Sequence, residues 1–340
     1  MKTAHKTARK TVPITRRSWL AQTLATCCAA PALIGLNPAR AASHFPSKPI
    51  TLWVPWAAGG ATDIVLRLLA ELASPHLRQR VLVDNRGGAG GTLAMPILQN
   101  AEPDGHTIAQ IPQPVLRAVH MQKVLWDPLR DITPVIQISG VTFGIVVPAH
   151  SEFRSVEDLF TFARAKPNTL TIATNGVGTT PHMVLDELFA ARGLSYVHVP
   201  YKGTSEQMLA VDAGHVMLGV NSTGFAPFVE SGRVRLLATF AARRSLRWPQ
   251  VPTLKELGYK VVAMSPYGLG GPRGLQPAVV SKLHDAFRAA MYEPAFALEL
   301  AKYDQVLDYL GPEEYGQSLR IEYAREKANV EKLGLARGGN

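Results

Sequence analysis

Short apolar runs alternate with amphipathic segments along most of this chain. The β-branched run at residues 50–54 predicts a strand. Residues 61–73 predict a helix, because apolar side chains recur there every three or four positions while Arg67 and Glu71 fall on the other side. Strands at 81–83 and 107–109 and a helix at 92–100 repeat the unit. Strands separated by helices predict a mostly parallel sheet covered on both faces.

The same alternation starts again after a long β-branched run at residues 141–147. The pattern predicts helices at 155–165, 181–191, 205–213 and 224–231, and strands at 170–173, 196–199, 216–220 and 236–240. A return segment begins at 261–263, and residues 277–333 are expected to be almost wholly helical, with breaks near Pro294 and Gly311. A second α/β domain is therefore predicted.

The first 41 residues differ from the rest of the chain. They carry seven basic residues, no Asp or Glu and both cysteines of the chain. A basic start is followed by an apolar stretch at 20–36 and then by a small-x-small sequence at 39–41. This order predicts a cleaved export signal peptide over residues 1–41. Arg16 and Arg17 favour the twin-arginine route. An ordinary Sec leader and a lipoprotein leader acylated at Cys27 remain alternatives.

Removing this leader changes the interpretation of composition and charge. The formal charge falls from +10 to +3, so the basic pI is no evidence for nucleic acid as a partner. The remaining 299 residues are long enough for two domains. They hold no cysteine, which excludes a thiol nucleophile, a disulfide and a cysteine-ligated zinc site.

Sequence motifs for catalysis or cofactors are missing. The chain contains no phosphate-binding loop, no Gly-x-Ser-x-Gly elbow and no His-Glu-x-x-His helix. Residues 176–181 imitate a dinucleotide fingerprint, but Pro181 stands at the third glycine and no acidic residue follows near 20 positions on. We interpret Asp63 as a first-turn carboxylate and His182 as a partly buried, hydrogen-bonded residue. The sequence therefore predicts a non-enzymatic protein with no catalytic residue, no metal and no cofactor.

Two glycine-rich turns each open a predicted helix. Residues 57–60 have no bulky side chain, so backbone N–H groups there can approach a ligand closely at the positive end of the helix dipole. Residues 176–181 place hydroxyls at the cap and Pro181 at the start of the helix. Two such helix starts facing one cleft would bind an anion.

Eight ordered motifs closely resemble the Bug family, the extracytoplasmic solute-binding proteins of tripartite tricarboxylate transporters. They include FPSKPI at 45–50, PWAAGGATD at 55–63, NRGGAGGT at 85–92, PDG at 103–105 and GTTPH at 178–182. The others are VPYKG at 199–203, VPT at 251–253 and GPEEY at 311–315. The resemblance spans essentially the whole chain after the leader.

The resemblance implies two α/β lobes of the periplasmic-binding-protein type, each a mostly parallel sheet flanked by helices. Crossing strands form the hinge between the lobes, and the lobes close on a small carboxylate. Lobe 1 is expected to comprise residues 42–144 and 265–340, and lobe 2 residues 145–264. The expected ligand-binding residues surround the turns and the lining strands: Trp56, Ala57, Ala58, Gly59, Gly60, Thr62, Thr174, Gly176, Val177, Gly178, Thr179, Tyr201, Lys202, Gly203, Asn221 and Ser222.

These features together predict a monomeric periplasmic protein that captures a small organic acid and delivers it to a membrane transporter or sensor. An exported α/β enzyme acting on a small carboxylate is the first alternative, and a module for neutral or amino-acid ligands is the second. The identity of the acid stays open, because residues 112–114 and 265–268 depart from the family pattern near the expected cleft.

Overall fold

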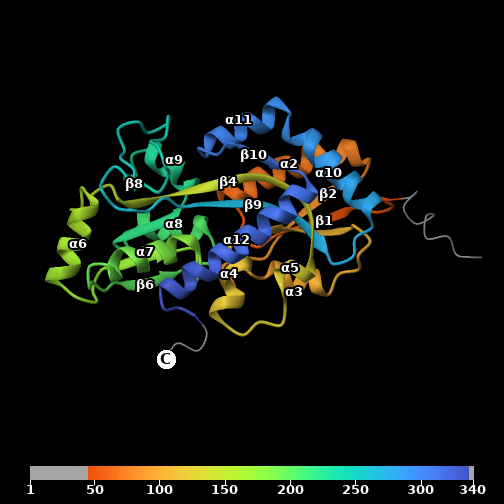
Figure 1. Ribbon diagram of the computed structural model, residues 1–340. Helices are drawn as coiled ribbons and strands as arrows, with labels where there is room; N and C mark the ends of the chain where they lie inside the picture. Colours follow the sequence, from red (N-terminus) through yellow and green to blue (C-terminus); the bar gives the residue numbers. More distant parts are fainter. Residues whose placement is uncertain (1–44, 337–340) are drawn as a thin grey trace, which may run out of the picture. The chain divides into compact units, whose positions relative to one another are not determined.

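A computed structural model describes residues 45–336, so the predicted signal peptide lies outside the described residues. Within that range the chain forms one ten-stranded sheet with helices on both sides (Figure 1). The strands are β1 Ile50–Val54, β2 Val81–Asn85, β3 Thr107–Ile111, β4 Ile132–Pro148, β5 Thr171–Thr174, β6 Val197–Pro200, β7 Leu218–Ser222, β8 Val234–Thr239, β9 Met264–Pro272 and β10 Leu307–Leu310. The helices are α2 Ala61–Leu77, α3 Ala94–Gln99, α4 Pro114–Met121, α5 Pro128–Asp131, α6 Val156–Ala165, α7 Thr180–Ala190, α8 Thr204–Asp212, α9 Ala226–Glu230, α10 Pro277–Met291, α11 Pro294–Lys302 and α12 Pro312–Lys332, with short 3₁₀ turns at Ala89–Gly91 and Thr223–Phe225.

The sheet is mixed, with strand order β2-β1-β3-β9-β4-β7-β5-β6 and with β8 and β10 also paired to β4. Parallel pairs join β1 to β2 and β3, and β5 to β6 and β7. Every pair that involves β4 or β9 is antiparallel. The α/β fold class predicted from the sequence is confirmed, and its parallel strands lie on the two sides of an antiparallel centre.

Strands β4 and β9 run side by side through the middle of the sheet (Figure 1). Their register extends from Ile132 opposite Pro272 to Thr142 opposite Met264. The N-terminal part of β4 pairs with β9 and β10, and its C-terminal part pairs with β7 and β8. Strand β4 therefore pairs directly with β7 and β8 on one side and is joined to β1, β2 and β3 through β9 on the other. The division of the chain into two lobes stays a prediction.

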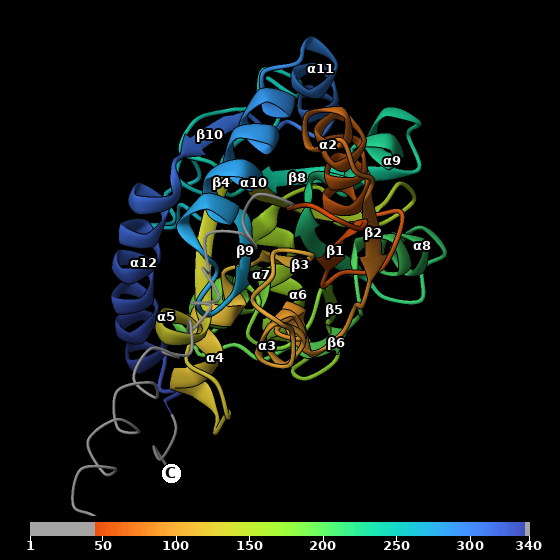
Figure 2. The same ribbon diagram turned by 90° about the vertical axis from the view of Figure 1, so that its right-hand side faces the viewer.

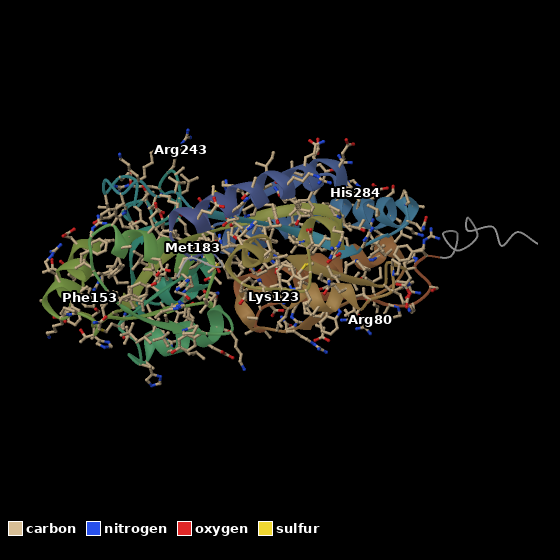
Figure 3. All side chains as sticks on the ribbon, turned by 60° about the horizontal axis from the view of Figure 1, so that its bottom comes forward. Arg80, Lys123, Phe153, Met183, Arg243 and His284 are labelled. Atoms are coloured by element: carbon tan, nitrogen blue, oxygen red, sulfur yellow. The ribbon has the colours of Figure 1, made fainter. Side chains whose placement is uncertain are left out.

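The helices pack on this sheet through their apolar faces. Helix α2 has its Val65, Leu66 and Leu69 fully buried, and it packs against α10 (Figure 2). Helix α12 packs on α4 and β4, and one face of it stays polar and exposed. Charged side chains such as Arg80, Lys123 and Arg243 extend outward from the surface (Figure 3). Within residues 45–336, no helix combines the length and apolar character needed to cross a membrane.

The prediction of an almost wholly helical segment at 277–333 is wrong at one place. Residues 307–310 form strand β10, where Leu307 pairs with Ser139 on β4. Two side chains of β4 fix the segment: the amide of Gln137 donates to Asp308 Oδ2 at 2.9 Å, and Ser139 Oγ donates to the carbonyl of Val306 at 2.8 Å. Distant pairing thus decides the conformation of four residues whose local pattern is ambiguous. Helices α4 and α5 were not predicted.

Candidate functional site

Three helices, α2, α7 and α8, begin with free amides at the wall of one cavity of about 50 Å³. Helix α4 also begins there, but Pro114 has no N–H, and the next two amides donate to the carbonyls of Pro112 and Gln113. Helix α2 contributes its first turn from Gly60, α7 contributes Thr179 to Pro181, and α8 contributes Thr204. The remainder of the wall comes from strand residues and from the loops that follow β1 and β3. The volume is several-fold below the roughly 300–1,000 Å³ of pockets for drug-sized ligands, so the site suits a compact molecule.

None of these three helices has a side-chain cap. Gly60, Thr179 and Gly203 occupy the N-cap positions, and no side chain accepts a hydrogen bond from the first backbone amides of the helices. The first amides of a helix have no acceptor within the helix, and the dipole adds positive potential at this end. Three positive ends at one cavity make its wall favourable for an anion.

The turn before α2 is held by the buried carboxylate of Asp63. Its Oδ2 accepts a hydrogen bond from the amide of Gly59 at 2.8 Å, and its Oδ1 accepts from Asn85 Nδ2 at 2.8 Å. Arg67 Nε lies 2.9 Å from Oδ1. Asp63 therefore orders the loop, and the Gly59 amide is already used. Gly59 needs its glycine, because its φ of +79° is in the left-handed region.

The turn before α7 is likewise closed on itself. The hydroxyl of Thr179 donates to the carbonyl of Gly176 at 2.7 Å, and the amide of Gly178 donates to His182 Nδ1 at 3.3 Å. The amide of Gly176 donates to Thr174 Oγ1 at 3.1 Å. The amides of both glycines are thus engaged within the turn, while the start of α7 faces the cavity.

Two histidines support this turn from behind. The rings of His182 and His198 stack with centroids 4.2 Å apart, and His198 Nε2 lies 2.6 Å from Thr174 Oγ1. Burial, opposed by Asp186, lowers the pKa of His182. Burial, with a further contribution from His182, lowers the pKa of His198 to about 4. Both rings are therefore neutral near pH 7 and act as hydrogen-bonding supports, in agreement with the reading of His182 from sequence.

The loops on the two sides of the cavity contact each other. Ser205 Oγ donates to the carbonyl of Ala58 at 2.9 Å. A Cβ placed on Gly203 would lie 2.9 Å from the amide nitrogen of Ala57, and a Cβ on Gly87 would lie 2.7 Å from the same atom. Both positions therefore require glycine for this close approach.

A buried arginine joins three elements next to the cavity. Arg117 on α4 pairs through Nε with Glu326 on α12 at 2.6 Å, and both side chains are about 97% buried or more. The same guanidinium donates to the carbonyl of Gly178 at 2.5 Å and to Thr180 Oγ1 at 3.4 Å. Gln113 donates to the other oxygen of Glu326 at 2.6 Å. Arg117 thus connects α12 to the turn that precedes α7.

Six of the sixteen residues expected from the sequence line the cavity: Trp56, Ala57, Gly60, Thr62, Thr179 and Ser222. The other ten do not belong to its wall: Ala58, Gly59, Thr174, Gly176, Val177, Gly178, Tyr201, Lys202, Gly203 and Asn221. Asn221 is fully buried and directs its Nδ2 to Met208 Sδ at 3.1 Å, while Val177 is exposed.

The expected set lacked the wall residues on strands, Gln110, Val141, Phe143, Ser265 and Tyr267, except Ser222. It also lacked wall residues on loops and helix starts: Ala61, Asp63, Pro112, Pro114, Asn175, Thr180, Pro181 and Thr204. Thr180, Pro181 and Thr204 could have been found, because they lie within one position of the starts of the predicted helices 181–191 and 205–213. Across the described range 45–336, no three or more His, Cys, Asp or Glu side chains are grouped to hold a metal ion.

Comparison with known proteins gives consistent matches. The family described as "Tripartite tricarboxylate transporter family receptor" matches residues 65–335. A Cupriavidus necator protein named for the gbd 5′ region is 44% identical over 325 residues, covering 95% of this chain and 99% of that protein. Protein BugT of Bordetella pertussis is 30% identical over 270 residues, covering 78% of this chain and 82% of BugT.

Solved structures agree with these matches. The periplasmic binding protein BugD superposes with a TM-score of 0.82 at 27% identity, covering 86% of this chain and 99% of BugD. MatC from Rhodopseudomonas palustris with bound malate gives 0.78 at 26% identity, covering 84% and 100%. A second R. palustris protein, solved with adipate, gives 0.80 at 27% identity, covering 86% and 99%.

Proposed function

This chain belongs to the family of tripartite tricarboxylate transporter receptors, as its resemblance to the Bug proteins predicts. We therefore propose that it captures a small organic carboxylate in the cavity and delivers it to membrane subunits of a transporter. The observation that carries the proposal is the meeting of three uncapped helix starts at one cavity. The ligand's carboxylate accepts hydrogen bonds from the first amides of α2, α7 and α8. MatC with malate and the adipate-bound relative support a carboxylate as the ligand class.

The anchor we propose differs in detail from the one expected from sequence. Gly59 and Gly178 give their amides to Asp63 and His182, so they shape the turns and do not hold the ligand themselves. Thr62 and Thr179 lie at the cavity, and their backbone stands at the helix starts. The remaining expected residues outside the wall position these turns.

Capture is proposed to occur by closure of two lobes, residues 42–144 with 265–340 against residues 145–264. Strands β4 and β9 are the elements that connect the two groups of strands, and the hydrogen bond from Ser205 to Ala58 is the kind of contact that closure would make. Small-angle scattering with and without a bound acid is expected to show a more compact bound form. An unchanged profile at saturation would argue for a rigid pocket.

A periplasmic location fits the periplasmic binding protein BugD and the leader-like residues 1–41. We propose that the leader is cleaved near Ala42 after export through the twin-arginine route, and that the mature protein is a monomer. The family is described as a receptor family and BugD as a periplasmic binding protein, so a binding role is favoured over the exported enzyme. Replacing Arg16 and Arg17 by lysine is expected to block export, whereas a Sec leader would tolerate the change.

The anchor can be tested with an internal competitor. Thr62→Asp places a carboxylate in the first turn of α2 at the cavity wall, where it favours the helix dipole but competes with a bound anion. We expect unchanged or slightly higher stability together with loss of binding to every carboxylate. Thr62→Asn, similar in size but uncharged, is the matched control and is expected to keep binding.

The first step is to identify the ligand by thermal-shift screening of the wild-type protein against mono-, di- and tricarboxylates. A ligand at 100 times its dissociation constant adds about 2.7 kcal/mol to the free energy of unfolding. Calorimetric titration of the two Thr62 variants then follows. Full binding by Thr62→Asp would refute the helix-start anchor, and no stabilisation by any carboxylate would refute the function.

A further inference from the structure

One buried amide at the cavity has a fixed orientation. Gln110 on β3 is 2% exposed and lines the cavity. Its Oε1 accepts a hydrogen bond from Trp56 Nε1 at 2.8 Å. An indole N–H can only donate, so the oxygen of the amide must face Trp56 and the NH₂ group must point elsewhere. Among residues 45–336 this Nε2 donates to no protein acceptor, and protein atoms do not enclose it completely.

The charges around the cavity limit what can bind there. No Lys, Arg or His belongs to the lining residues. The single charged residue of the wall, Asp63, already has Gly59, Asn85 and Arg67 on its oxygens. The three helix starts can compensate one carboxylate. A second buried carboxylate would have no cation, and burying an unpaired charge is strongly unfavourable.

Apolar side chains cover part of the wall. Val141 and Phe143 from β4, Tyr267 from β9 and the two prolines Pro112 and Pro114 lie there. The hydroxyl of Tyr267 is bound to Gln305 Oε1 at 2.9 Å. The strands also bring the hydroxyls of Ser222 and Ser265 to the wall, and among the strand residues there Gln110 alone carries a side-chain N–H donor.

Resting on the proposed carboxylate-binding function, we propose that the ligand is a compact monocarboxylate with a neutral oxygen acceptor, a hydroxyl or carbonyl group, and that Gln110 selects it by donating Nε2–H to that oxygen. The small cavity favours a short carbon chain. A ligand without the oxygen leaves the buried amide donor unsatisfied, which reduces affinity. A dicarboxylate of equal length is rejected because its second charge is unpaired.

Four-carbon acids supply a matched panel: butyrate, its 2-, 3- and 4-hydroxy derivatives, and succinate. Calorimetric titration of the wild-type protein is expected to show one hydroxybutyrate binding about tenfold or more tighter than both butyrate and succinate. In Gln110→Leu that preference over butyrate disappears, while butyrate itself binds with nearly wild-type affinity. Retained preference in a folded Gln110→Leu protein overturns the inference.

Gln110→Glu is a second variant for the case that Gln110→Leu fails to fold. Its carboxylate can still accept the hydrogen bond from Trp56 Nε1. It presents an oxygen in place of the NH₂ group, so it is expected to weaken the preferred hydroxybutyrate and to weaken succinate further. Unchanged selectivity in this variant also overturns the inference.

The failure of this inference differs from failure of the proposed function. Wild-type protein that binds succinate or another di- or tricarboxylate more tightly than every four-carbon monocarboxylate would overturn the inference and keep the function. Wild-type protein that binds other carboxylates but none of the four-carbon monocarboxylates would likewise overturn the inference and keep the function. Absence of binding to any carboxylate would overturn both.

Discussion

The buried pair of Arg117 and Glu326 should separate stability from binding in a double-mutant cycle. Both side chains are almost fully buried, and Nε lies 2.6 Å from Oε2. Removing one partner of such a pair leaves an uncompensated buried charge and costs about 3–5 kcal/mol in free energy of unfolding. We expect this loss for Glu326→Leu and for Arg117→Leu, measured by urea denaturation.

The double variant is expected to recover most of that loss. Two leucines in place of the pair remove both buried charges together, and such replacements are commonly neutral or stabilising. Its free energy of unfolding should lie about 1.5–3 kcal/mol below the wild type, because the hydrogen bond from Arg117 to the carbonyl of Gly178 is still lost, against a sum of about 6–10 kcal/mol for independent effects. A double variant as unstable as that sum would refute the reasoning. The exposed pair Arg244 and Glu256 is the control, and its removal should have little effect.

The double variant should recover stability without recovering affinity for the ligand. Arg117 also donates to the carbonyl of Gly178, in the turn that brings the start of α7 to the cavity. A hydrogen bond to a charged donor contributes about 1.5–3 kcal/mol. The stable double variant should therefore bind the carboxylate at least about tenfold more weakly by calorimetry. Wild-type affinity in that variant would show that Arg117 does not position the turn.

Three further changes test other contacts. Gly203→Ala fits the extended backbone, but its Cβ would lie 2.9 Å from the nitrogen of Ala57, so the two loops must separate and the affinity for the ligand should fall. The control is Gly316→Ala, whose Cβ meets nothing closer than 3.5 Å, and equal affinity in both variants would refute the contact. Burial lowers the pKa of His198 to about 4 against about 6.5 when unfolded, so the unfolded state binds the proton first and the wild type should lose stability as pH falls from about 6.5 to about 4. His198→Gln should lose less between pH 7.5 and 5 in urea titrations, and an identical pH dependence would contradict this assignment. Phe287→Ala, at a fully buried position, should reduce the free energy of unfolding by about 3–5 kcal/mol, and a loss below 1 kcal/mol in urea would contradict its place in the core.

Local pattern was sufficient for the elements whose apolar faces repeat within a few residues. Strand β1 has the predicted bounds, and α2 starts at the predicted Ala61 and continues four residues past the predicted end. The pattern failed at residues 307–310, where Gln137 and Ser139 of a distant strand fix the conformation.

The candidate site was predictable to the extent that it consists of helix starts. The sequence located the two glycine-rich turns and the helices behind them. It could not show that Asp63 and His182, each four residues beyond a glycine, take up that glycine's amide. It also could not place Gln110 beside the cavity, because strand pairing over long separations brings β3, β4 and β9 together.

The pairing of β4 with β9 has a consequence for the order in which the protein can fold. Residues 132–142 meet their partners only when residues 264–272 exist, and β3 needs the same segment. During synthesis from the N-terminus, the N-terminal part of β4 stays without β9 until more than three quarters of the chain has been made, whereas its C-terminal part can pair earlier with β7 and β8. Closing so long a loop before contacts form makes folding slow. We therefore expect truncated chains that end before β9 to expose β3 and β4 as unpaired edges and to aggregate.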